Sequence, residues 1–148
     1  MSAPSLPMVE TRFTDPPAPS QPIKVLLIED SVVLAERMAD DLREIPEIQL
    51  VGTVDSEVEA IAAMDRQRID VVLMDLQLRQ GTGFGVLRAV RRMEHKPRIV
   101  ILTNYDLPEY KSAAAQLGVV DFLDKARDFE RLPAVLRGVL GDAAVRES

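Results

Sequence analysis

The chain contains no cysteine and no tryptophan, and only one histidine among its 148 residues. Without cysteine, disulfide bonds and thiolate metal sites are excluded. The single histidine, His95, lies in a polar stretch away from the predicted strand ends, and we interpret it as a surface residue. Because the absence of cysteine fits a reducing compartment, we expect a cytoplasmic protein.

Long apolar runs and an excess of positive charge are also missing. No run approaches the roughly 20 apolar residues of a membrane-spanning helix, and the N-terminus lacks the basic start and apolar core of a secretory signal. Acidic residues number 24 against 18 Lys and Arg, which gives a net charge of −6. Since binding to a nucleic-acid backbone requires a basic surface, we expect neither a membrane nor a nucleic-acid partner.

The length and a hydrophobic content of 47% indicate one domain with a substantial core. Residues 1–22 hold most of the prolines and show no apolar periodicity, so a flexible N-terminal tail is predicted there. The domain itself is predicted over residues 23–141, and residues 142–148 form a short C-terminal tail.

Five short apolar runs predict buried strands, at Ile23–Ile28, Gln49–Val54, Val71–Met74, Ile99–Leu102 and Val119–Leu123. Helical patterns separate them. The second helix is expected to begin at a capping box that starts with Ser56, and to face inward with Val58, Ile61 and Ala62. Gly118 is expected to end the fourth helix in a left-handed conformation. The fifth helix is expected to reach about Leu140, and Pro133 must either lie in its first turn or break it.

This alternation predicts an α/β fold. A flavodoxin-like, doubly wound, five-stranded parallel sheet of order 2-1-3-4-5, with helices on both faces, suits five strands best. In that order the first and third strands flank the crevice in which ligands bind, beyond the carboxyl ends of the strands.

Chemically useful side chains follow the apolar runs where each strand ends. Glu29, Asp30 and Asp75 follow the first and third strands, and Thr103 and Lys125 follow the fourth and fifth. Three acids in one crevice repel one another unless a cation lies between them. Because oxygen is the only ligand type offered, the sequence predicts a hard ion, Mg²⁺ or Mn²⁺.

With a metal in place, a carboxylate can attack phosphorus. We predict that Asp75 is this nucleophile, that Asp30 binds the metal directly, and that Glu29 binds it from an outer position. The backbone carbonyl of Gln77 is predicted to complete the protein's ligands. Thr103 and Lys125 are expected to bind phosphoryl oxygens. Taken singly, each position also has an ordinary role as a helix cap or a turn residue, and it is their joint occurrence that favours a site.

From Ile23 to about Leu140 the chain closely resembles the receiver domain of two-component response regulators. The matching motifs are Lys24–Asp30, Asp70–Leu76, Gly81–Gly83, Ile101–Thr103 and Gly118–Lys125. The resemblance implies that a histidine kinase, or a histidine phosphotransfer protein, donates a phosphoryl group to Asp75 in a Mg²⁺-dependent step. It also implies self-catalysed dephosphorylation, and a switch in which Phe122 turns inward when Thr103 moves to the phosphate.

The chain departs from the usual receiver pattern at three places. Ala126 stands where a proline commonly follows the conserved lysine, and Arg79 stands where a proline commonly lies four residues after the acceptor. Asn104 is larger than the usual Ala or Gly. Together with Gln77 and Tyr105, which flank the path of the phosphate, it is predicted to slow hydrolysis of the phosphorylated form.

Three functions remain to be compared. The first is a stand-alone receiver without a DNA-binding domain that signals by protein contact to an unknown downstream partner, with a phosphorylation-linked homodimer left open. The second is a degenerate receiver that acts as a docking or dimerisation module. The third is a haloacid-dehalogenase-like phosphatase, which needs a second Asp where Gln77 stands, so the sequence argues against an enzyme beyond the self-catalysed steps.

Overall fold

The computed structural model describes residues 22–103, 108–125 and 128–138. Their elements are β1 (Ile23–Ile28), α2 (Val32–Arg43), β2 (Ile48–Val54), α3 (Glu57–Arg66), β3 (Val71–Met74), α4 (Gly83–Arg91), β4 (Arg98–Thr103), α5 (Pro108–Gln116), β5 (Val119–Asp124), the short 3-10 turn η2 (Phe129–Arg131) and a helix over residues 132–138. The predicted end of the last helix at Leu140 and nearly all of both predicted tails lie outside the described residues.

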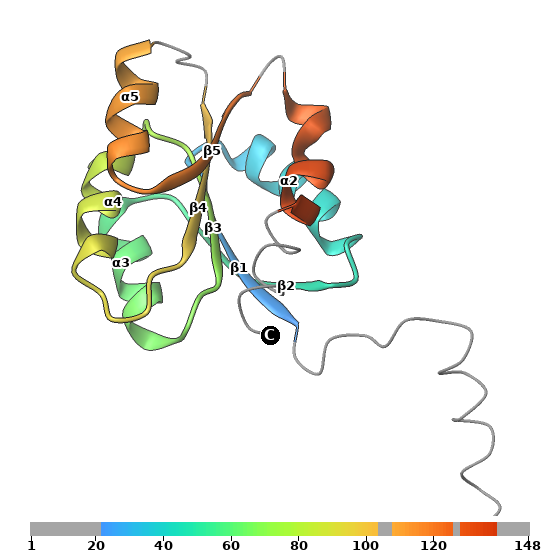
Figure 1. The fold of residues 1–148 in the computed structure, drawn as a ribbon. Coiled ribbons are helices and arrows are strands. Elements are labelled where there is room, and N and C mark those ends of the chain that lie inside the picture. Colours follow the sequence, from blue (N-terminus) through green and yellow to red (C-terminus); the bar gives the residue numbers. More distant parts are fainter. Residues whose placement is uncertain (1–21, 104–107, 126–127, 139–148) are drawn as a thin grey trace, which may run out of the picture.

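The strands form one parallel sheet in the order β2-β1-β3-β4-β5, which confirms the predicted fold class (Figure 1). Helices α3, α4 and α5 cover one face, while α2 and the helix over 132–138 cover the other. Within the described residues, no helix is long and apolar enough to cross a membrane.

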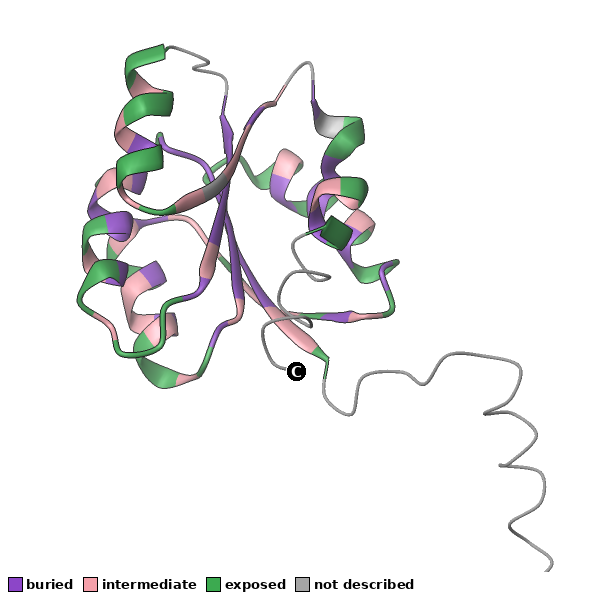
Figure 2. Ribbon diagram, viewed as in Figure 1, coloured by how far each residue is buried: buried purple, intermediate pink, exposed green. Residues whose placement is uncertain are grey.

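The core consists of two apolar layers, one on each side of the sheet. Alternation along β1 sends Val25 and Leu27 toward α2, and Leu26 and Ile28 toward α3 and α4. All four residues of β3 are buried, as expected for the central strand of a sheet that is covered on both faces (Figure 2).

Hydroxyl side chains cap the N-termini of three helices, namely Ser31 for α2, Ser56 for α3 and Thr82 for α4. Ser31 Oγ accepts a hydrogen bond from the Leu34 N–H at 3.3 Å, and Ser56 Oγ accepts one from the Glu59 N–H at 3.3 Å. Such caps stabilise a helix by about 1 kcal/mol. At the end of α5, Gly118 has φ 89°, so the predicted left-handed cap is confirmed.

The predicted inward face of α3 was wrong. Val58 is 73% exposed and Ile61 and Ala62 are only half-buried, whereas Ala60 and Ala63 are buried. The cause is the buried N-cap Ser56. Residues four and seven positions after an inward-facing residue share its side of a helix, so the cap turns the two alanines toward the sheet.

Candidate functional site

The carboxyl ends of β1, β3 and β5 meet at one edge of the sheet, and the backbone ladder continues one residue beyond each strand. The Glu29 N–H donates to the Val54 carbonyl at 2.9 Å, and the Asp75 N–H donates to the Ile28 carbonyl at 3.0 Å. The Lys125 N–H donates to the Thr103 carbonyl at 2.8 Å. The backbones of three predicted site residues are therefore fixed by the sheet itself.

The three predicted acids come together. Glu29, Asp30 and Asp75 each offer a carboxylate oxygen, and these oxygens lie within 4.8 Å of one another. Glu29 and Asp75 are buried at 3% and 6% exposure, whereas Asp30 is exposed and open to solvent. A group of carboxylate oxygens that is open on one side fits Mg²⁺, which keeps several of its waters when it binds to proteins.

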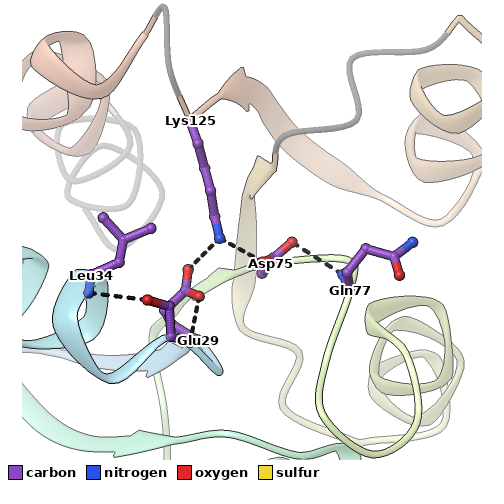
Figure 3. A network of polar contacts seen from close by, with 6 residues as sticks. Glu29, Leu34, Asp75, Gln77 and Lys125 are labelled. Atoms are coloured by element: carbon purple, nitrogen blue, oxygen red, sulfur yellow. Dashed lines mark hydrogen bonds and ion pairs between the residues drawn. The ribbon is translucent and has the colours of Figure 1, made fainter.

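Lys125 reaches into this acidic group from the end of β5 (Figure 3). Its Nζ lies 2.8 Å from Glu29 Oε1 and 2.6 Å from Asp75 Oδ2, and only 8% of its side chain is exposed. The sequence predicted that Lys125 would pair with a phosphoryl oxygen, and it gave no sign of the contact with Glu29. In this structure the ammonium is the cation that links the two buried carboxylates.

The remaining carboxylate oxygens accept backbone hydrogen bonds. Asp75 Oδ1 accepts from the Gln77 N–H at 3.1 Å, and Glu29 Oε2 accepts from the Ser31 N–H at 3.0 Å (Figure 3). Desolvation raises the pKa of Glu29 and outweighs its hydrogen bonds with Lys125 and Ser31. Burial alone would lower the pKa of Lys125, but its hydrogen bonds to Asp75 and Glu29 together raise it.

Thr103 and Phe122 lie on the two neighbouring strands beside the acids. Thr103 is the last residue of β4 and is fully buried. Phe122 is half-buried and packs on the α3–α5 side of the sheet, with Lys111 Nζ of α5 lying 6.0 Å from the centre of its ring. The alternation of residues in the sequence could not assign Phe122 to one face of the sheet, whereas the structure places it on the face covered by α3, α4 and α5.

The loop that follows Asp75 contains Gln77 and Arg79. Arg79 forms a bidentate ion pair with Asp55, which lies two residues before α3, with Nη2–Oδ1 at 3.0 Å and Nε–Oδ2 at 3.2 Å. This pair raises the pKa of Arg79 and lowers that of Asp55. The predicted metal contact of the Gln77 carbonyl remains a prediction. Asn104, Tyr105 and Ala126 lie outside the described residues.

Residues 25–137 match the family model for the response regulator receiver domain. Since this match covers most of the chain, the protein belongs to the response regulator receiver family. The fold and the acids at the carboxyl edge of the sheet agree with that assignment.

Among curated proteins, the chain is 34% identical over 114 residues to the transcriptional regulatory protein BtsR of Escherichia coli K12. It is 28% identical over 115 residues to the sensory transduction protein LytT of Bacillus cereus. The alignments cover 77% and 78% of this chain but only 46% of either relative. The chain thus spans about half the length of the curated relatives that it matches.

Solved receiver domains superpose over nearly their full length. The signal receiver domain of a putative LuxO repressor protein from Vibrio parahaemolyticus matches with a TM-score of 0.79 and 24% identity, covering 86% of this chain and 96% of that one. The receiver domain of the putative response regulator NarL from Mycobacterium tuberculosis matches with a TM-score of 0.73 and 26% identity, covering 82% and 98%.

Proposed function

We propose that Asp75 accepts a phosphoryl group from the phosphohistidine of a histidine kinase or a histidine phosphotransfer protein. The observation that carries this proposal is the position of Asp75. Its carboxylate is buried at the end of the central strand, between two further acids and one lysine. Its backbone is fixed by the hydrogen bond to the Ile28 carbonyl, so the proposed nucleophile is held in place at the carboxyl edge of the sheet.

In the proposed step, a carboxylate oxygen of Asp75 attacks phosphorus as the P–N bond of phosphohistidine breaks. The bonding electron pair stays on the imidazole nitrogen, and an aspartyl phosphate forms. The phosphorylated form is then switched off by hydrolysis, in which water attacks phosphorus, the P–O bond to Asp75 breaks, and inorganic phosphate leaves. Both reactions require positioning and neutralisation of charge more than proton transfer by the protein.

Glu29, Asp30 and Asp75, with the carbonyl of Gln77, would hold the magnesium ion on which the transfer depends. When bound, Mg²⁺ neutralises part of the negative charge that gathers on the phosphoryl oxygens. The donor set supports this choice of ion, since it consists of oxygens alone.

Lys125 and Thr103 would then detect the phosphoryl group. The ammonium of Lys125 already contacts Asp75 Oδ2 at 2.6 Å, so a phosphoryl oxygen on that carboxylate lies within its reach. Thr103 ends the adjacent strand β4 and would donate its hydroxyl to another oxygen. Phe122, half-buried against the α5 side, would follow Thr103 inward and alter the surface formed by β5 and α5.

The partners of this chain remain predictions. The phosphodonor is proposed from the family, and the output is proposed to be protein contact through the altered surface. BtsR is named a transcriptional regulatory protein, and about half of its length lies outside the match. The expectations of no DNA-binding domain and no nucleic-acid partner therefore stay predictions, as does the cytoplasmic location.

The function is tested by incubating the protein with acetyl phosphate, with and without Mg²⁺, and measuring its intact mass. We expect a single phosphoryl adduct that needs Mg²⁺, is labile to base and is absent from Asp75→Asn. An unmodified wild-type protein would support the docking module instead. Repeated turnover of phosphomonoesters would support the phosphatase, and either result overturns the proposal.

A further inference from the structure

The loop between Asp75 and α4 is fastened to the beginning of α3. The Glu57 N–H donates to the Gln80 carbonyl at 3.1 Å, and Glu57 Oε1 accepts from the Thr82 N–H at 3.1 Å. Arg79 adds the ion pair with Asp55. Glu57 thus holds this loop through its backbone and its side chain together, whereas the Arg79 pair joins two side chains that are 55% and 39% exposed.

The Glu57 side chain fills space that two glycines leave open. Gly81 has φ 79°, and a Cβ atom at this residue would lie 2.6 Å from Glu57 Cβ. A Cβ atom at Gly85 would collide with the carboxylate of Glu57. Thr82, whose N–H donates a hydrogen bond to the Glu57 carboxylate, is the N-cap of α4. A negative charge is favourable at the N-terminus of a helix, so packing and electrostatics hold Glu57 in the same place.

A short series of contacts links this position to the acceptor. Thr82 pairs with Gln77 across the loop in an isolated antiparallel bridge, and the Gly83 N–H donates to the Leu76 carbonyl at 2.9 Å. Gln77 in turn donates its N–H to Asp75 Oδ1 at 3.1 Å. Fixing Thr82 therefore fixes the backbone of Gln77, which carries both this donor and the carbonyl proposed for the metal.

We propose that Glu57 is a positioning residue of the phosphoacceptor site, which acts through Thr82 to hold the backbone of Gln77 beside Asp75. This inference rests on the proposed function. The sequence indicated Glu57 only as the residue after the N-cap Ser56, because the contact with Thr82 spans 25 positions of the chain. Neither the positions of the glycines nor the capping box at Ser56 predicts which side chain fills the space beside Gly81 and Gly85.

The positioning role is tested first without metal or phosphodonor, by hydrogen exchange of the backbone amides in residues 76–83. Loss of a charge-assisted hydrogen bond in Glu57→Ala should speed exchange there about tenfold and leave β1 and β3 unchanged. Glu57→Gln keeps an acceptor oxygen and should stay within about threefold of wild type. Glu109→Ala removes an exposed acid from the first turn of α5 and serves as the matched control. Unchanged exchange in Glu57→Ala, or faster exchange throughout the sheet, overturns the proposal.

Titration calorimetry with Mg²⁺ alone gives the second readout. Residues that orient metal ligands typically change affinity by 10–100-fold, so we expect Glu57→Ala to weaken Mg²⁺ binding about tenfold and Glu57→Gln to weaken it less. Equal affinity in Glu57→Ala and wild type contradicts the inference. A wild-type protein that binds Mg²⁺ but forms no adduct with acetyl phosphate contradicts only the proposed function.

Gly85→Ala offers an independent variant that leaves Glu57 in the sequence. Its new Cβ atom would displace the flexible end of the Glu57 side chain, so the same amides should exchange faster, as in Glu57→Ala. In the Glu57→Ala background the three atoms nearest to this Cβ, all of them in the Glu57 carboxylate, are gone, so Gly85→Ala should cause no further increase. Two effects that add fully in the double variant would show that Gly85 acts without Glu57, and the proposal would fail.

Discussion

Strand β3 has an aspartate just beyond each of its ends, and the two aspartates lie in opposite surroundings. Asp70, which precedes the strand, accepts a hydrogen bond from the Lys24 N–H at 2.9 Å and has Arg68 and His95 at 3.6 and 3.9 Å. Asp75, which follows the strand, is grouped with two other acids and has Lys125 as its ion-pair partner in the described structure. Asp70 is compensated, whereas Asp75 belongs to a group with an excess of negative charge.

This difference is the one expected between a structural carboxylate and the phosphoacceptor that we propose. Asp70 joins β1 to β3 at the amino edge of the sheet, since its N–H also donates to the Lys24 carbonyl at 2.9 Å. At the carboxyl edge, one buried ammonium pairs with two of the three neighbouring carboxylates, and the third, Asp30, is open to solvent. Groups of buried like charges are concentrated at sites that bind cations or ligands. The charges around a carboxylate are therefore a better guide to its function than its burial alone.

The largest expected effect is a difference between Asp75→Asn and Asp70→Asn in the rate of phosphorylation. Asp75→Asn removes the nucleophile and should reduce the adduct formed from acetyl phosphate by about 100-fold or more. Asp70→Asn should stay within about twofold of wild type, because Asp70 lies at the opposite edge of the sheet. Intact-mass measurements over time report both rates, and equal losses in the two variants would remove the distinction.

Lys125→Met should be the most destabilising of the changes considered at the acidic site. It leaves Glu29 and Asp75 buried without their shared ammonium, which we expect to cost about 3 kcal/mol in the free energy of unfolding. Urea unfolding measures this loss, and Mg²⁺ should restore more stability to Lys125→Met than to wild type. Lys96→Met, a change at an exposed lysine, is the control. A Lys125→Met protein as stable as wild type in EDTA would contradict the account.

Asp70→Ala should destabilise the fold by about 1–2 kcal/mol because the Lys24 N–H loses its acceptor. In contrast to Lys125→Met, the loss should not depend on Mg²⁺, since no group of acids surrounds Asp70. Urea unfolding in EDTA and in Mg²⁺ gives the two values. A loss that Mg²⁺ reverses would place Asp70 in the metal-dependent part of the molecule, against this comparison.

The smallest expected effect is a dependence of stability on pH at Glu29. Because desolvation raises the pKa of Glu29 above its usual 4.5, the folded state binds this proton more tightly than the unfolded chain does. In EDTA, the stability that Glu29 contributes should fall as the pH rises from 4.5 through its folded-state pKa. Urea unfolding of wild type and Glu29→Gln over this range measures the difference, which Mg²⁺ should abolish. A wild-type protein that gains stability relative to Glu29→Gln as the pH rises would reverse the sign and contradict the assignment.

The carboxyl edge of the sheet was predictable because its residues follow buried strands, so strand order alone brings Glu29, Asp30 and Asp75 together. Contacts made by long side chains were not predictable. The pairing of Lys125 with Glu29 depends on how the end of β5 approaches β1. The position of the Glu57 side chain depends on the space left by Gly81 and Gly85, which are distant in the sequence. The inward face of α3 was missed because the buried cap Ser56, rather than the larger apolar residues, sets its rotation.

The site of modification is the most direct test of the account. Borohydride reduces an aspartyl phosphate to homoserine, so peptide mass spectrometry of the phosphorylated and reduced protein identifies the acceptor. We predict homoserine at position 75 and unmodified aspartate at position 70, in a reaction that requires Mg²⁺. Conversion of Asp70, Asp30 or any other aspartate in place of Asp75 would contradict the claim that the acids at the carboxyl edge form a phosphoacceptor site.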